Sequence, residues 1–469
     1  KTNQKGGILM NNDINNLPTL KEIEGNLFQE LQNYFQLIMV SLLEDVDKWL
    51  MNNRDYQRYE NREIQSCTID TMFGSITIKR RIYRDRYKGE RVALLDKYLR
   101  FNGSDSISPF LTELMVDWAS RGPSYRDVRD RFIDLLGYQV SSHETIRQHV
   151  LKIQPKEVEL EPEKKPKKVD TLFLEVDGLH ISKQNSSRKS REIKFGIVHE
   201  GWEKRHPSSN EYSLVNKSFW HSMDKGEDFW ETFSRYLYEH YDITKDTQVI
   251  INGDRAPWIR SGVEYFESAM YTYDRYHLKK WIKETLNNRT EEERSKVIQA
   301  ADANDPVELV VAIAEAEKEE MDPEKKEEIA DMRLFILENM DAFRDYREIL
   351  RKEKGVDTTG MRPMGAAESN MNFFAKRLKG GYSWSAAGVD AMTSAIIHRF
   401  EETLSKAIHD SCGPGHAKRK EKRYPSFATL LTEKASKAVG VIKGHIPALV
   451  KDDQGKPYTR VLRGLAGLS

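Results

Sequence analysis

The sequence predicts an α/β protein preceded by a mainly helical N-terminal part, and two observations lead to that class. From residue 171 onward, apolar runs of strand length alternate with segments in which apolar residues recur at helical spacing. Before residue 171, the apolar residues recur mostly at helical spacing, with one stretch of β-type alternation. A length of 469 residues allows two to four domains, which agrees with this change of pattern.

The first hundred residues predict a helical and β-hairpin module. Residues 17–52 carry apolar residues at helical spacing, which predicts one long amphipathic helix or two shorter ones. Within residues 64–100, the run CTIDTMFGSITIKRRIY alternates β-branched and polar residues around Phe73 and Gly74. That alternation predicts a hairpin.

Residues 124–153 predict two helices separated by a short turn. Gly137 suits the left-handed residue that ends a first helix, and a Ser-Ser pair followed by Glu144 suits the start of a second. This is the plan of a helix-turn-helix unit, although any pair of antiparallel helices has the same pattern. If the region binds DNA in this way, the candidates that face the groove are Arg147, Gln148 and His149.

The part after residue 171 predicts the element order of a ribonuclease-H-like core. Residues 154–170 come first; they are densely charged, contain three prolines and are expected to form an exposed linker. Three strands then precede a helix, a strand, a helix, a strand and a helix. The strands are expected at 171–181, 191–199, 212–220, 247–253 and 268–274.

A helical and acidic segment interrupts this core. Residues 286–355 hold 12 basic and 20 acidic residues, a net charge of −8, in an almost wholly helical pattern. Helical spacing resumes at 365–380 and 389–410. The expected organisation is a non-native leader before Met10 (1–9), a helical and hairpin module (10–110), a helix-turn-helix region (111–153), a linker (154–170), a core in two parts (171–285 and 358–410), an acidic all-α insertion (286–357) and a basic tail (411–469).

The composition bounds the cellular setting. The chain has no net charge overall, but residues 411–469 hold 12 basic and 4 acidic residues, a net charge of +8. This tail is either a segment that binds a polyanion or an ordinary solvated basic tail. Cys67 and Cys412 lack the spacing of a disulfide framework or a zinc site, which favours a reducing cytoplasm. No apolar run approaches the roughly 20 residues of a membrane span.

Three acidic residues occupy distinctive positions in the predicted core. Asp177 is expected at the end of the first strand, Asp254 at the end of the fourth, and Glu368 at the start of a helix after the insertion. Carboxylates at such ends can converge on one edge of an open sheet, where they repel one another unless a cation lies between them. Oxygen ligands of this kind suit Mg²⁺ or Mn²⁺. Taken singly, each acid is more often a turn or capping residue; together they predict a two-metal site for phosphoryl transfer.

Several neighbours of these acids have expected supporting roles. Asp274 and His277 lie three residues apart just after the fifth strand, so both project from the first turn of a helix. The Asp can orient the His, which can bond the metal network or a phosphate; direct metal ligation by the His is less expected among oxygen ligands. A capping Asp beside a surface His is the plain alternative. Gly178 is expected to turn the chain after Asp177. Glu175 is expected either to have a structural role or to support the metal ligands from behind.

These motifs together resemble those of a transposase family. The Asp-x-x-His pattern after the second acid, the helical insertion, and ESNMNFFAKRLKGGYSWSAAG at 368–388 resemble bacterial insertion-sequence transposases of the Lre type, catalogued as an uncharacterised protein family. They are also similar to Mutator-like DDE transposases, which share an Asp/Cys-x-x-His motif and an all-α insertion. The resemblance covers most of residues 17–410. It implies that Asp177, Asp254 and Glu368 are catalytic metal ligands and that Asp274 and His277 form an accessory motif.

The helix that begins with ESNM supplies candidate DNA contacts on this interpretation. Asn372 and Lys376 follow the glutamate at four-residue steps and so share its helix face. Arg377 and Lys379 are candidates for contacts with the DNA backbone. Trp384 is a candidate for stacking on a flipped base, although an aromatic residue in a short loop is more often packed.

The resemblance implies a DNA transposase that uses Mg²⁺ or Mn²⁺, two ions per active site. It would bind the terminal inverted repeats of its element, cut double-stranded DNA there and join the 3′ ends to target DNA. It would act as a homodimer or larger oligomer at the nucleoid in the bacterial cytoplasm, with no membrane as a partner. Two alternatives stay open: a structure-selective nuclease on the same scaffold, and a non-catalytic helix-turn-helix regulator derived from a transposase. Retention of all three acids argues against the regulator.

Overall fold

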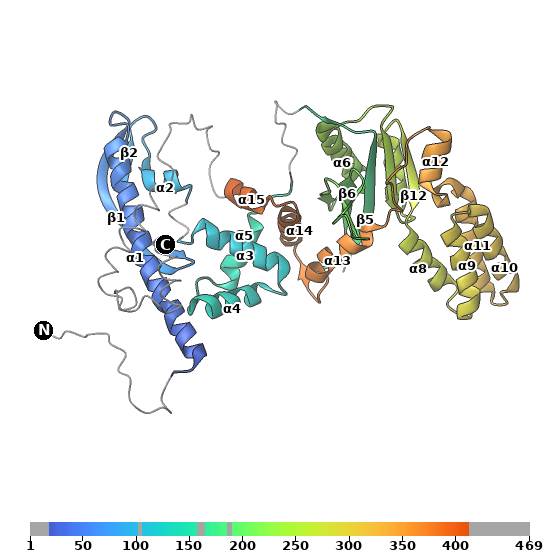
Figure 1. Cartoon of the computed structure of the whole chain (residues 1–469), viewed down its shortest axis with the longest axis horizontal. Helices are drawn as coiled ribbons and strands as arrows, with labels where there is room; N and C mark the ends of the chain where they lie inside the picture. The colour runs from blue at the N-terminus through green and yellow to red at the C-terminus, as the bar shows by residue number, and fades with distance from the viewer. Residues whose placement is uncertain (1–17, 102–105, 157–164, 185–189, 412–469) are drawn as a thin grey trace. The chain divides into compact units, whose positions relative to one another are not determined.

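The computed structural model describes residues 18–101, 106–156, 165–184 and 190–411 (Figure 1). The chain divides into two compact units, each with a core of its own. One unit consists of Lys1–Ala119, Ser124–His149 and Ser405–Ser469, and the other of Ser120–Pro123 and Val150–Leu404. The expected leader and all of the expected basic tail except Ser411 lie outside the described residues.

The first unit contains a long helix packed on a β-hairpin, as the spacing of its apolar residues predicts. The elements are α1 (Leu20–Asn53), β1 (Tyr59–Thr71), β2 (Gly74–Asp85), β3 (Arg91–Ala93) and α2 (Leu94–Leu99). α1 begins at a capping box in which Thr19 and Glu22 each accept a hydrogen bond from the other's backbone N–H. Leu43, Val46 and Ile78 lie in the core between α1 and the hairpin.

The helices along residues 109–151 include the predicted pair. They are α3 (Pro109–Arg121), α4 (Tyr125–Leu136) and α5 (His143–Leu151); α15 (Leu404–Ser411) comes at the end of the described chain. α4 begins where the Ser124 hydroxyl accepts from the Asp127 N–H at 3.1 Å, and it ends at Gly137, whose φ is +78°. The Ser142 hydroxyl accepts from the Thr145 N–H at 3.0 Å at the start of α5. The predicted end of the first helix at Gly137 and the predicted start of the second at the Ser-Ser pair are confirmed.

The second unit is built on a mixed sheet. Its strands lie in the order β12, β11, β5, β6, β9. They are β5 (Thr171–Lys183), β6 (Ser190–His199), β9 (Ser218–Ser222), β11 (Gln248–Gly253) and β12 (Ala269–Tyr273), and β13 (Ser383–Trp384) pairs with the last residues of β5. β6 runs antiparallel to β5 and β9, whereas β11 runs parallel to β5 and β12.

Two predictions about this sheet are wrong. Residues 212–220 do not form one strand, because Asn216 has a positive φ of 51° that breaks the extended backbone before β9. The residues before that break form β8 (Tyr212–Leu214), which pairs with β7 (Trp202–Lys204) in a separate sheet. Gly178 does not turn the chain, because β5 continues past it and pairs Gly178 with Lys194 of β6.

The expected linker is tied to the second unit at both of its described ends. The Lys156 ammonium group lies 2.7 Å from the Ser218 hydroxyl and 2.8 Å from a Glu401 carboxylate oxygen. β4 (Lys167–Lys168) pairs in parallel with β10 (Tyr241–Asp242). Residues 157–164 lie outside the described residues.

Alternate side chains of β5 enter two cores on opposite faces of the sheet. The helices of this unit outside the acidic segment are α6 (Gly226–His240), α7 (Pro257–Arg260), η2 (Ser261–Tyr265), α8 (Arg275–Thr285), α13 (Ala366–Leu378) and α14 (Ala386–Phe400). Leu174 and its even-numbered neighbours pack against α6, which covers one face (Figure 1). Phe173 packs on the other face with Tyr346 of α12 (Tyr346–Glu353). α13 covers β6, where the ring centroids of Phe195 and Phe374 lie 4.5 Å apart.

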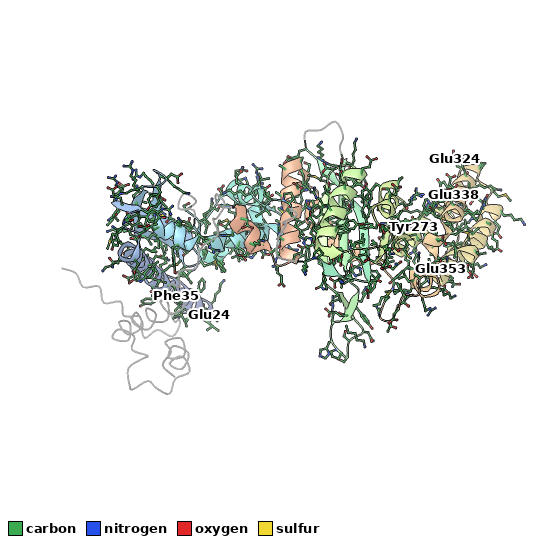
Figure 2. The ribbon with its side chains drawn as sticks, turned by 90° about the horizontal axis from the view of Figure 1, so that it is seen from above. Glu24, Phe35, Tyr273, Glu324, Glu338 and Glu353 are labelled. Atoms are coloured by element: carbon green, nitrogen blue, oxygen red, sulfur yellow. The ribbon has the colours of Figure 1, made fainter. Side chains whose placement is uncertain are left out.

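The acidic segment is helical, as predicted, but it shares a core with α8. α9 (Glu291–Ala303), α10 (Pro306–Glu319), α11 (Pro323–Glu338) and η3 (Met340–Phe343) pack with the apolar side of α8. Tyr273 is buried where the sheet meets these helices (Figure 2). Its ring centroid lies 5.0 Å from that of Phe343. Glu324, Glu338 and Glu353 are exposed on α11 and α12 (Figure 2). Among the described helices, none is long and apolar enough to cross a membrane.

Candidate active site

Asp177 lies where the central strand loses a neighbour. β11 pairs with β5 only as far as Asn252 opposite Glu175, and β13 joins β5 at Ser182. Asp177 therefore stands in the gap between them, in the middle of β5 and not at the strand end that the sequence predicts. Its Oδ1 accepts from the Gly178 N–H at 2.7 Å.

Asp254 follows β11 directly, as predicted. Its Oδ1 accepts from the Ala256 N–H at 2.8 Å, so the side chain closes a turn. The Tyr271 hydroxyl donates to the Asp254 carbonyl at 2.6 Å and ties this turn to β12. Asp254 thus has the turn role that an Asp after a strand often has, while its side chain stays half-buried beside the site.

Asp274 and His277 form the predicted pair at the start of α8. The Oδ1 of Asp274 accepts from the His277 N–H at 3.0 Å and also lies 3.0 Å from the ring Nδ1 of His277. The Asn252 amide donates to Oδ2 of Asp274 at 3.0 Å, and the Thr272 hydroxyl donates to Asn252 at 3.1 Å. With Nδ1 engaged by a buried carboxylate, His277 has Nε2 left for a ligand.

Glu368 lies in the first turn of α13, and Glu175 holds this turn. Glu175 is only 1% exposed, and its Oε2 accepts from the Ala367 N–H at 2.8 Å. Its two oxygens lie 3.2 and 3.3 Å from the Gly365 nitrogen, at a helix start that has no side-chain cap of its own. The sequence shows that Glu175 shares a strand face with Asp177. Its partners follow 190 residues later, so no local pattern reveals them.

Asp177, His277 and Glu368 come together at one point. Each offers one ligand atom, and these atoms all lie within 4.8 Å of one another. All three side chains are half-buried. Two carboxylates and an imidazole at this separation are a donor set for a divalent cation. Asp254, a ligand expected from the sequence, is not in this group, whereas His277, expected only as an accessory residue, is.

The charges of this site act on one another. The pKa of Asp177 is raised to about 6: burial is the main cause, His277 and the Gly178 N–H oppose it, and the charges of Asp254 and Asp274 add to the rise. Burial also raises the pKa of Asp274, but hydrogen bonds from His277 and a neighbouring amide outweigh burial and hold this pKa below its ordinary value. The hydrogen bond to Asp274 raises the pKa of His277 against the effect of burial, and the charges of Asp177 and Asp254 add to the rise. The site therefore favours positive charge at its centre.

The DNA-contact candidates near Glu368 are divided between exposed and buried positions. Asn372, Lys376 and Lys379 are exposed. Arg377 and Trp384 are buried, at 4% and 7% exposure, and the Arg377 guanidinium lies 5.0 Å over the Trp384 ring. The indole N–H donates to a backbone carbonyl of α13 at 2.9 Å. Trp384 is therefore a packing residue here, and the prediction that it stacks on a base is contrary to its burial.

The candidates on α5 are held within the helix. Arg147 and Gln148 each donate to Glu144 at 2.7 Å, one turn earlier. Gln148 is exposed and Arg147 is half-buried. His149 is only 6% exposed, so it is not a surface residue, contrary to the prediction that it faces a DNA groove.

Most of the chain is similar to bacterial proteins of one family. Residues 13–410 match UPF0236, an uncharacterised protein family. A UPF0236 protein in the vanSb 3′ region of Streptococcus gallolyticus is 27% identical over 383 residues, which cover 80% of this chain and 81% of the relative. A UPF0236 protein of Caldanaerobacter subterraneus subsp. tengcongensis is 25% identical over 353 residues, which cover 75% of this chain and 69% of the relative. Another from the same organism is 23% identical over 417 residues, which cover 83% of each chain. Because the family match spans nearly all of the described residues, the chain belongs to the UPF0236 family.

Proposed function

We propose that this protein is a DDE-type DNA transposase. It binds the terminal inverted repeats of an insertion sequence, cleaves the DNA at the ends of the element and joins the 3′ ends to target DNA. The observation that carries the proposal is the group formed by Asp177, His277 and Glu368, whose ligand atoms lie within 4.8 Å of one another although they come from three separate elements.

The donor atoms of this group fit Mg²⁺ or Mn²⁺. Oxygen ligands suit both ions, and the imidazole of His277 makes Mn²⁺ the better probe. The Asp254 carboxylate, close enough to raise the pKa of Asp177, is the further ligand that a pair of ions would use. Metal ions, when bound, would activate the attacking oxygen and stabilise the leaving oxygen.

The residues of the chain position this chemistry. Asp274 holds the His277 ring by its Nδ1, which directs Nε2 toward the ligand. In the first reaction a water oxygen attacks phosphorus and the bond from phosphorus to the 3′ oxygen breaks. In the second, the freed 3′-hydroxyl attacks a phosphorus of the target and breaks one target P–O bond. Neither reaction needs a nucleophilic side chain.

The arrangement of the strands supports the same proposal. On one side of the central strand β5, β6 and then β9 are each antiparallel to the strand before. On the other side, β11 and then β12 are each parallel to the strand before. We assign this sheet to a ribonuclease-H-like core, with the acidic helices as its insertion, and residues 111–153 to a DNA-binding helix-turn-helix. Because two element ends must be joined, we expect a homodimer or larger oligomer on DNA, in the bacterial cytoplasm at the nucleoid.

The proposed phosphate contacts are exposed basic residues on the elements that carry the site or directly follow its residues. Arg255 directly follows Asp254, and its guanidinium lies 4.4 Å over the ring of Trp281 in α8. Lys280 and Lys283 are exposed on α8, three and six residues after His277. Lys376 and Lys379 on α13, named above, would continue this surface. Contacts of this kind supply much of the affinity of a protein for DNA and make it salt-dependent.

The names of two relatives favour transposition over a plain nuclease or regulator. The name of one Caldanaerobacter relative joins eleven locus designations, and that of another joins four. A gene that moves or copies itself is expected at many places in one genome. Neither a structure-selective nuclease nor a regulator requires such repetition.

The proposal is tested with Asp177→Asn and a matched control, Asp246→Asn, which changes an exposed Asp of the same unit. On DNA that carries the inverted repeats flanking the gene, Asp177→Asn is expected to abolish Mg²⁺-dependent cleavage but to leave binding in EDTA intact. Asp254→Asn and Glu368→Gln are expected to do the same. Cleavage by Asp177→Asn at the wild-type rate would refute the assignment. Cleavage by the wild type without strand transfer would favour the nuclease, and binding without cleavage the regulator.

A further inference from the structure

The first turn of α13 is capped by a side chain from the sheet. A helix start usually receives an acceptor from the residue just before it, most often Ser, Thr, Asp or Asn. Gly365 stands there instead, with a φ of +143° and no side chain. Glu175 of β5 supplies the acceptor: its Oε2 lies 2.8 Å from the Ala367 nitrogen and 3.2 Å from the Gly365 nitrogen.

This cap joins the two elements that carry the carboxylates of the proposed metal site. Glu175 and Asp177 are two positions apart in β5, so their side chains leave the same face of the strand, about 7 Å apart along it. Ala367, which donates to Glu175, is the residue next to Glu368. A single carboxyl group therefore fixes the start of α13 against the strand that bears Asp177.

We propose that Glu175 is a positioning residue, which sets the separation between the carboxylates of Asp177 and Glu368. The inference rests on the proposed function, because it concerns the metal affinity of the same group. Glu175 itself does not touch the ion; it acts through the backbone of α13. Without its hydrogen bonds, the first turn of α13 would lose its fixed register on β5, and Glu368 would no longer meet Asp177 at one point.

Glu175 is buried beside the ring of His199. The Nε2 atom of His199 lies 3.7 Å from Oε1, and both side chains are wholly buried. In the described part of the chain, this Nε2 has no hydrogen-bond partner, whereas Nδ1 lies 3.2 Å from the Gly201 carbonyl oxygen. The rings of Phe173 and Trp202 pack on His199, with centroids 5.2 and 4.9 Å away. Glu175 therefore lies beside a buried His199 ring that aromatic neighbours hold in place.

The test compares two Glu→Gln variants in the full chain. Glu175→Gln keeps the shape of the side chain but removes its negative charge and leaves one accepting oxygen instead of two for the N–H groups at the start of α13. The control, Glu401→Gln, changes another carboxyl group of the same unit that is 9% exposed, accepts from the Phe219 N–H at 2.8 Å and pairs with Lys156. Both variants are expected to lower the thermal unfolding temperature. Only the first is expected to disturb the metal site.

The readout is the dissociation constant of Mn²⁺, measured by electron paramagnetic resonance of the free ion at a temperature where every variant is folded. Glu175→Gln is expected to raise this constant about tenfold or more, in line with other supporting partners of metal ligands. Glu401→Gln is expected to leave it within about twofold of the wild type, as expected of a site whose ligands and their supports are untouched. An unchanged constant in Glu175→Gln, despite a lower unfolding temperature, would overturn the inference, because Glu175 would then stabilise the fold alone.

The proposed function fails in a different way. If the wild-type protein does not bind Mn²⁺, or if Asp177→Asn binds Mn²⁺ with the same dissociation constant as the wild type, the metal site itself is refuted. If binding depends on Asp177 but not on Glu175, only the positioning role is refuted. Should Glu175→Gln fail to fold, Gly365→Ala provides the same test. A φ of +143° is strained for alanine, so the backbone at residue 365 is expected to move and to displace the N–H that donates to Glu175. A dissociation constant unchanged in Gly365→Ala would then overturn the inference.

Discussion

Replacing His277 by Gln distinguishes a metal ligand from an accessory residue. In the structure, the His277 ring belongs to the group of three, and its Nδ1 is 3.0 Å from Asp274. If Nε2 binds the ion, His277 must lose its proton on binding, since only the neutral ring has a lone pair for the metal. If the role is only to orient a phosphate, metal binding displaces no proton from His277.

The magnitude follows from the two raised pKa values. The hydrogen bond to Asp274 raises the pKa of His277 above 6.5, and burial raises that of Asp177 to about 6. A proton and a metal compete for each ligand, so the dissociation constant rises as pH falls, about tenfold per pH unit for each proton displaced. Between the pKa of His277 and pH 6, we therefore expect the dissociation constant to rise about tenfold per pH unit, because one proton is displaced; below pH 6 two protons are displaced and the rise is about a hundredfold per unit. His277→Gln should weaken binding about tenfold or more at neutral pH and should abolish the pH dependence above pH 6.

The assay is an Mn²⁺ titration of wild-type protein and His277→Gln between about pH 5.5 and 8.5, within which the shifted groups titrate. The variant is expected to keep only the dependence below about pH 6, which belongs to Asp177. A wild-type affinity that does not change above pH 6 would refute ligation by His277. The remaining place would then fall to Asp254, as the sequence predicts.

Two further predictions concern the DNA surface and the packing behind it. Replacing Lys280 and Lys283 together by Ala should reduce the magnitude of the slope of log binding constant against log salt concentration by about 1.8, since each phosphate contact contributes about 0.9. As a control, replacing the exposed Lys318 and Lys326 of the acidic helices by Ala should leave the slope unchanged. Equal slopes in the wild type and both variants would exclude α8 from the DNA surface. Trp384→Ala should lower the free energy of unfolding by about 3–5 kcal/mol in chemical denaturation, because the indole is buried and hydrogen-bonded; a loss below about 1 kcal/mol would contradict the packing role.

The parts of the site that local pattern could predict are those fixed by neighbours in sequence. Asp254 after β11, Asp274 as a helix cap and Glu368 in a first turn all follow from strand ends and helix starts that the residues themselves encode. The prediction that Asp177 ends its strand is wrong because its setting depends on another strand. β5 does not end there; its neighbour β11 does, and no pattern within β5 records that.

The remaining differences have the same cause. Glu175 finds its partners 190 residues later, and His277 joins the ligand group only because α8 and α13 meet at β5. Trp384 looks like a loop residue in sequence, yet α13 covers it. Arg147 looks like a groove-facing cation, yet Glu144 one turn earlier engages it. Pairings across the fold decide each of these, and a single sequence gives only the residue types.

The acidic helices cannot be treated as a removable insert. Leu278 and Ile282, on the side of α8 opposite Tyr276, belong to one apolar cluster with Ile313 and Ile336 of those helices. Cutting out residues 286–357 would leave that side of α8 in water and loosen the helix whose first turn holds His277. A shortened chain intended for biochemistry should therefore keep residues 286–357.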